Sequence, residues 1–207
     1  MEVSLNDEIV AVCTDLGHFN QLDGTYILNN NDYNTKTCIR DLIKYLRRDD
    51  NDFTVRRQMG MSNIVESDLI PIIEQHCSDD KELFDRVLRL LVDLTNPILL
   101  HFKEKMPKDT DKQMQFIQLE NYLVDYKVAF ASHKKVWLVI GKHMKKILDI
   151  DSQERDVEDE LMFERILVLI RNILHIPIDD SLEKGTDDDK NAQDLIIENM
   201  HQSSINE

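Results

Sequence analysis

Two stretches of the chain repeat one pattern of apolar side chains, and this repeat limits the fold more than any other feature. Residues 84–98 read FDRVLRLLVDLTNPI, and residues 163–178 read FERILVLIRNILHIPI. Leu88 corresponds to Leu167, 79 residues later, which is close to two periods of the roughly 40–47 residues of HEAT and armadillo units. Both stretches are apolar almost all round, as helices buried between neighbouring repeats are. The pattern predicts an all-α, armadillo/HEAT-like helical-repeat solenoid; two unrelated core helices of a bundle are the alternative.

The remaining apolar residues also recur at helical spacing, and no segment alternates with the period of a strand. The chain has only 5 glycines and 4 prolines, which disfavours a β-sandwich with its many turns. We expect Gly17 to end the first helix, Ser67 or Asp68 to cap the helix that carries Pro71, and Asp79 with Glu82 to form a capping box. The predicted helices lie near residues 5–16, 35–48, 53–59, 67–76, 79–95, 111–130, 134–148, 157–174 and 191–201.

The composition changes near the end of the chain. Residues 1–178 carry the helical pattern and form the predicted repeat domain. Residues 179–190 are acidic and polar, which predicts a flexible loop, although an ordinary insertion between two helices has the same composition. Residues 191–207 resemble the start of a further repeat, so we expect the array to be truncated here.

Charge and cysteine usage limit the classes of partner. The formal net charge is −15, so the overall field repels nucleic acid, and a nucleic-acid contact would need a local basic patch. The 3 cysteines are far apart, which predicts neither a disulfide framework nor a zinc site and suits a reducing compartment. The amino terminus lacks the features of a signal peptide, and no apolar run is long enough to predict a membrane span.

No catalytic motif is present in the sequence. HExxH, GxSxG, P-loop and GxGxxG patterns are all missing. His76 and Cys77 are adjacent, so on a helix their side chains point about 100° apart and cannot act as a dyad. The sequence therefore predicts a protein that is not an enzyme, with no catalytic residues, no cofactor and no metal.

Two clusters of basic residues stand out in this acidic chain. The first is the candidate contact for DNA or an acidic partner, and it consists of Arg40, Lys44, Arg47, Arg48, Arg56 and Arg57. The second consists of Lys134, Lys135, Lys142, Lys145 and Lys146. Either cluster could bind phosphate or carboxylate groups. Either could also be an ordinary solvated helix face, and Asp41, Asp49, Asp50 and Asp52 favour that alternative for the first cluster.

Several ordered strings resemble the amino-terminal region of the Timeless family. They are LDGTY (22–26), RDLIKYLRRD (40–49), SDLIPIIEQH (67–76), DRVLRLLVDLTNP (85–97), KVAFAS (127–132) and ERILVLIRNILHIP (164–177). The resemblance runs from Ile9 to about His201. The basic YLRRD string is more similar to the replication branch of the family than to the insect circadian-clock branch.

The resemblance implies an armadillo/HEAT-like fold and a nuclear location. It further implies a scaffold that binds a small Tipin-like partner and replisome proteins, stabilises stalled replication forks and supports checkpoint signalling. For some members it implies the circadian partners Period and Cryptochrome, so a clock-regulatory binding module is the alternative function. The family has no catalytic residues to transfer to this chain. Its members are several times longer than 207 residues.

Overall fold

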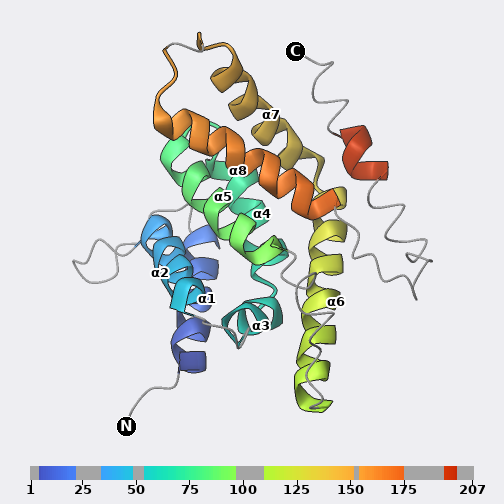
Figure 1. The fold of residues 1–207 in the computed structure, drawn as a ribbon. Coiled ribbons are helices and arrows are strands. Elements are labelled where there is room, and N and C mark those ends of the chain that lie inside the picture. The colour runs from blue at the N-terminus through green and yellow to red at the C-terminus, as the bar shows by residue number, and fades with distance from the viewer. Residues whose placement is uncertain are drawn as a thin grey trace. The chain divides into compact units, whose positions relative to one another are not determined.

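The computed structural model describes residues 5–21, 34–48, 54–96, 110–151, 154–174 and 194–199. All regular secondary structure in these ranges is helical (Figure 1). The all-α class is therefore confirmed for the described part of the chain, while the armadillo/HEAT-like solenoid stays a prediction. None of the helices described there is long and apolar enough to cross a membrane.

The chain divides into two compact units, Met1–Leu94 and Thr95–Glu207. The first contains α1 (Leu5–Gln21), α2 (Thr35–Arg48), α3 (Thr54–Met61), the π-helix η1 (Val65–Leu69), α4 (Ile70–His76) and most of α5 (Lys81–Thr95). The second contains α6 (Thr110–Ser132), α7 (Lys134–Leu148), α8 (Val157–Leu174) and a helical stretch at residues 194–199. The predicted bounds of α2, α7 and α8 agree with these.

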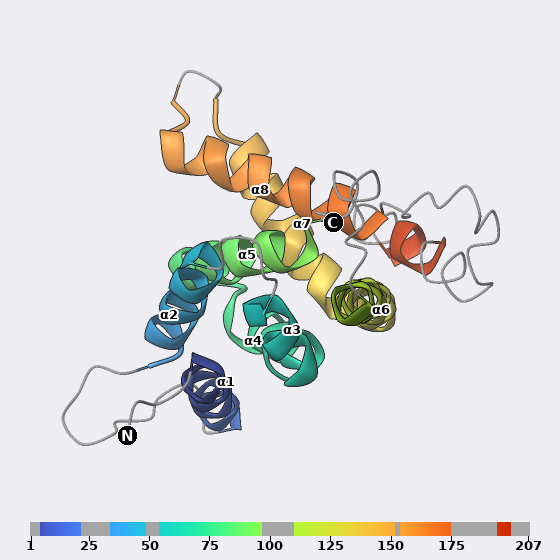
Figure 2. The same ribbon diagram turned by 60° about the horizontal axis from the view of Figure 1, so that its bottom comes forward.

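In the first unit, α1 lies against α2, α3 and η1 (Figure 2). Ile9 and Leu16 of α1, Ile39 and Leu42 of α2, and Met59 of α3 are completely buried. The prediction that Gly17 ends the first helix is wrong, because α1 continues to Gln21. Burial of Leu16 one residue earlier keeps the helix packed at the point where glycine alone would favour its end.

Two predicted caps in this unit also differ from the structure. The backbone N–H of Leu83 donates to Asp80 Oδ1 over 2.9 Å, so Asp80 and not Asp79 is the N-cap of α5. Neither Ser67 nor Asp68 caps a helix, because both lie inside η1, which runs directly into α4. Pro71 does stand in the first turn of α4, but because η1 runs directly into α4, its missing N–H removes one hydrogen bond of a continuous helix.

In the second unit, α7 and α8 run side by side and both contact α6 (Figure 1). Trp137 is buried, and its Nε1–H donates to the carbonyl oxygen of Phe130 over 2.9 Å. The rings of these two residues have their centroids 5.8 Å apart. Asp156 caps α8, since its Oδ1 accepts from the backbone N–H of Asp159 over 2.7 Å.

The two matched segments of the sequence repeat are buried differently. Leu88 on α5 is 1% exposed, but Leu167 on α8 is 47% exposed. The repeat predicts that the helices carrying Leu88 and Leu167 occupy equivalent buried positions, and this prediction is wrong for Leu167 itself. On α8 the buried apolar side chains are Met162, Ile166, Leu169 and Ile173, which form one row. Helix α5 buries seven apolar side chains on one broader face. The same apolar pattern thus serves as a narrow stripe in α8 and as a broader face in α5.

The helical stretch at residues 194–199 lies near the end of α6. Ile196 is fully buried, and Asn199 Nδ2 donates to the carbonyl oxygen of Ala131 over 3.1 Å. Ile197 is 54% exposed. The predicted acidic loop at 179–190 and the predicted domain limit at 178 lie outside the described residues and stay predictions.

Candidate basic surface on helices α2 and α3

Helix α2 presents the first basic cluster because its apolar residues all fall on the other side. Asn34 starts the helix by accepting the backbone N–H of Thr37 at its Oδ1 over 3.1 Å. Cys38, Ile39, Leu42 and Ile43 are buried toward the core of the unit. Arg40, Lys44 and Arg47 follow one another at spacings of four and three residues and are all exposed. These three side chains therefore share one outward face of the helix, and their role as a contact for DNA or an acidic partner stays a prediction.

One carboxylate sits between two of these cations. Asp41 Oδ1 lies 3.4 Å from Arg40 Nε and 2.9 Å from Lys44 Nζ. Both cations are about half exposed, so each pair is worth at most about 1 kcal/mol. With three cations and one anion, the outward face of α2 keeps a local excess of positive charge.

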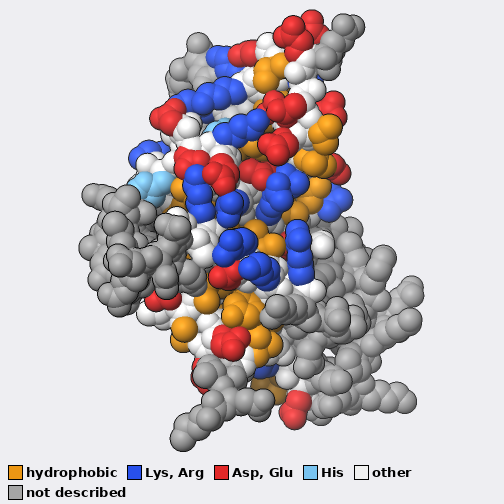
Figure 3. Space-filling view, turned by 90° about the vertical axis from the view of Figure 1, so that its left-hand side faces the viewer, with side chains coloured by type: hydrophobic (Ala, Val, Ile, Leu, Met, Phe, Trp, Pro, Cys, Tyr) orange, Lys and Arg blue, Asp and Glu red, His pale blue; other side chains and the backbone are white. Residues whose placement is uncertain are grey.

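None of the other three residues of the predicted site, Arg48, Arg56 and Arg57, is described as exposed. Arg56 and Arg57 lie on α3, which contacts α2 within the same unit, but both are only partly exposed. The side chain of Arg48 and residues 49–53 lie outside the described part of the chain. Seen from the side on which α2 lies, Lys and Arg side chains are interleaved with Asp and Glu side chains (Figure 3). The structure therefore groups Arg40, Lys44 and Arg47 as the exposed part of the predicted site.

A second ionic group, absent from the sequence prediction, joins α2 to the start of α5. Lys36 Nζ lies 2.9 Å from both Asp80 Oδ2 and Glu82 Oε2. Arg86 donates to Glu82 Oε1 over 2.7 Å and to the carbonyl oxygen of Lys36 over 3.2 Å. Lys36 is 44 to 50 residues from Asp80, Glu82 and Arg86 in sequence, and no spacing rule connects it to them. Glu82 and Arg86 are an i,i+4 pair.

The pKa shifts in this group agree with its geometry. Burial alone would lower the pKa of Lys36, but hydrogen bonds to Asp80 and Glu82 raise it above its ordinary value. Burial alone would raise the pKa of Asp80, but hydrogen bonds from the Leu83 N–H and from Lys36 lower it. Hydrogen bonds from Lys36 and Arg86 lower the pKa of Glu82. All three groups are therefore held in their charged forms.

The cysteines of this unit are placed as core residues. Cys13, Cys38 and Cys77 are all buried free thiols. Burial raises the pKa of Cys13 to about 11 and that of Cys77 to about 12, which is the opposite of what a nucleophilic thiolate needs. Within the part of the chain that the structure describes, no group of three or more His, Cys, Asp or Glu side chains could hold a metal ion.

Comparison with known proteins gives the family. The family model described as Timeless protein matches residues 30–207. The chain is 42% identical to the human protein timeless homolog over 204 residues, and 40% identical to the mouse protein timeless homolog over 203 residues. It is 33% identical to the protein timeless of Drosophila melanogaster over 156 residues. It is 26% identical to topoisomerase 1-associated factor 1 of Aspergillus terreus over 200 residues.

The shares of each sequence that are aligned differ greatly. The human match covers 98% of this chain but only 16% of the human protein, and the mouse match has the same proportions. The chain therefore spans about a sixth of the length of these relatives. Because the family model covers most of the chain and the mammalian relatives align with nearly all of it, this protein belongs to the Timeless family.

Proposed function

We propose that this chain is part of a non-enzymatic nuclear scaffold that stabilises replication forks and supports checkpoint signalling. The observation that carries the proposal is the family match over residues 30–207, with 42% identity to the human relative. The Aspergillus relatives are named as factors associated with topoisomerase 1, an enzyme that acts on DNA, and a place beside duplex DNA suits that name. A Tipin-like small partner and replisome proteins are the proposed protein partners.

The basic surface of α2 is the proposed contact for phosphate. Arg40, Lys44 and Arg47 are exposed on one face of a helix whose opposite face is buried. Arginine suits this role because its planar guanidinium can donate two parallel hydrogen bonds to one phosphate. Asp41 opposes binding by pairing with Arg40 and Lys44, so Arg47 is expected to contribute most. Arg48, Arg56 and Arg57 would extend the same contact.

Charge reversal on α2 tests this contact. The double variant Arg40→Glu with Arg47→Glu should weaken binding of a fluorescein-labelled DNA duplex. It should also reduce the slope of log K against log salt by about 2, because two phosphate contacts are lost. Fluorescence anisotropy at several salt concentrations measures both quantities.

Arg171→Glu is the matched control, since Arg171 is an exposed arginine on α8 in the other unit. It should leave affinity and slope unchanged. An unchanged affinity and slope in the α2 variant would mean that these arginines are ordinary surface residues paired with acidic neighbours.

A circadian-clock regulatory module is the second candidate function. It is favoured by the match to the Drosophila protein timeless, which covers 74% of this chain at 33% identity. The higher identity and 98% coverage of the mammalian homologs favour the replication role. Co-purification of the full-length protein distinguishes the two: recovery of a Tipin-like partner and replisome proteins supports the scaffold, and recovery of Period or Cryptochrome supports the clock module.

A further inference from the structure

The outward side of α7 is a basic surface with an unusual composition. In its 15 residues, Lys134–Leu148, the helix has five lysines and no aspartate or glutamate. We call these five the lysine face: Lys134, Lys135, Lys142, Lys145 and Lys146. Four of them are exposed and Lys142 is partly exposed. The chain has a net charge of −15, so this helix is a locally positive segment of a negatively charged protein.

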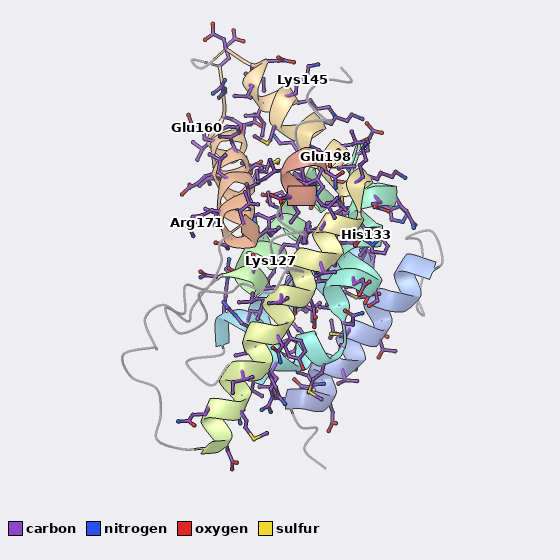
Figure 4. The ribbon with its side chains drawn as sticks, turned by 90° about the vertical axis from the view of Figure 1, so that its right-hand side faces the viewer. Lys127, His133, Lys145, Glu160, Arg171 and Glu198 are labelled. Atoms are coloured by element: carbon purple, nitrogen blue, oxygen red, sulfur yellow. The ribbon has the colours of Figure 1, made fainter. Side chains whose placement is uncertain are left out.

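The opposite side of α7 is held in place by buried side chains and hydrogen bonds. Val136, Trp137, Ile140, His143 and Ile147 are buried on the opposite side of the helix. The Trp137 indole N–H donates to the carbonyl oxygen of Phe130 at the end of α6. Arg155 donates to the carbonyl oxygens of Leu148 and Ile150, each over 3.2 Å, and so covers the carboxyl end of the helix. His133 and Lys145 lie toward the two ends of α7 (Figure 4). The lysine face is therefore carried on a rigid helix.

An apolar residue stands in the middle of the lysine face. Leu138 is 42% exposed, and it lies four residues after Lys134, three after Lys135 and four before Lys142. On a helix these are the neighbouring positions of the same surface. Leu148, which is 52% exposed, ends the same helix. The surface thus offers cations around an apolar centre.

This combination distinguishes between two kinds of anionic partner. A phosphate backbone presents charge and sugar, and an exposed leucine contributes nothing to that contact. An acidic polypeptide segment with spaced apolar side chains can pair its carboxylates with the lysines and cover Leu138 at the same time. Lysine, a compact charge on a flexible stem, also lacks the planar fork that favours arginine at phosphate.

We propose that the lysine face of α7 binds an acidic, leucine-containing segment of a partner protein. This site is on a different unit from the basic surface of α2 and does not depend on the phosphate contact proposed there. The carboxylates that follow α7, Asp149 and Asp151, repel an acidic segment from that end. The segment should therefore lie over Lys134, Lys135, Leu138 and Lys142.

Three fluorescein-labelled probes test the proposal with the 207-residue chain. One is a glutamate-rich peptide with leucine at every fourth position, the second has serine in place of leucine at the same charge, and the third is a DNA duplex. Lys135→Glu with Lys142→Glu should weaken binding of the leucine peptide at least about tenfold, equivalent to about 1.4 kcal/mol. Leu138→Ala should reduce the affinity of the leucine peptide to that of the serine peptide and leave DNA binding unchanged.

Two controls keep the result interpretable. Arg171→Glu, an exposed charge reversal in the same unit, should leave peptide affinity unchanged. Trp137 is the only tryptophan and lies on the buried side of α7, so unchanged fluorescence emission shows that each variant keeps α7 packed. Equal affinity for the leucine and serine peptides would overturn the proposal. So would lysine variants that lose DNA binding but keep peptide binding.

Discussion

Leu88 lies in the core with 1% of its surface exposed, whereas Leu167, its partner in the sequence repeat, is 47% exposed. Removing a buried leucine side chain costs the transfer free energy of its carbons and leaves a cavity as well. Removing an exposed leucine side chain loses little transfer free energy and leaves little or no cavity. The two residues are thus a matched pair in which only burial differs.

We expect Leu88→Ala to lower the free energy of unfolding by about 2–5 kcal/mol and Leu167→Ala to change it by about 0.5 kcal/mol or less. Urea denaturation followed by circular dichroism measures both. Equal losses in the two variants would show that Leu167 is buried in solution and that the repeat interpretation of the two helices is correct after all.

At the scale of elements, Asp80 joins α2 and α5 in two ways. Its carboxylate accepts the Leu83 N–H as the N-cap of α5 and pairs with Lys36 at the start of α2. Asp79, directly before it, is exposed and has the same charge. The N-cap is the residue whose carboxylate reaches the N–H of the third helical residue, Leu83, and in α5 that residue is Asp80.

Asp80→Ala should destabilise the protein by about 0.5–2 kcal/mol through loss of the cap, and Asp79→Ala should have a clearly smaller effect. Asp80→Asn keeps an acceptor for the cap and loses the ion pair, so it should fall between them. Thermal unfolding of the three variants at neutral pH gives this order. Similar losses from Asp79→Ala and Asp80→Ala would instead support a capping role for Asp79.

The carboxylates of Asp80 and Glu82 make the stability of the folded protein depend on pH. The pKa of Asp80 and that of Glu82 are lowered in the folded protein. Their stabilisation is therefore present above their unfolded-state pKa values and is lost as the pH falls through the folded ones. The stability difference between the wild-type protein and Asp80→Asn should be largest at neutral pH and shrink in acid.

At the scale of the whole molecule, burial is distributed unevenly along the chain. Helix α5 buries seven apolar side chains: Leu83, Phe84, Val87, Leu88, Leu90, Leu91 and Leu94. The helical stretch at residues 194–199 buries Ile196 and is tied to Ala131 by the Asn199 amide. Local opening free energies follow the amount of buried apolar surface.

Amide hydrogen exchange should therefore be much faster at residues 194–199 than in α5. Mass spectrometry of peptides from the two regions at neutral pH measures this. A mid-chain control is α7, which is packed through Trp137 and should exchange slowly. Exchange as slow at 194–199 as in α5 would mean that this stretch is part of the stable core.

The sequence by itself determined the all-helical class, the bounds of α2, α7 and α8, and the family. These follow from local periodicity and from strings of residues, which need no knowledge of distant contacts. It also placed Arg40, Lys44 and Arg47 on one face, because helical spacing alone decides that. Only the tertiary structure decided that Leu88 is buried and Leu167 is exposed, since burial depends on which elements pack against each face. The same holds for the pairing of Lys36 with Asp80, 44 residues away, because no periodic pattern encodes a contact between side chains so far apart in the chain.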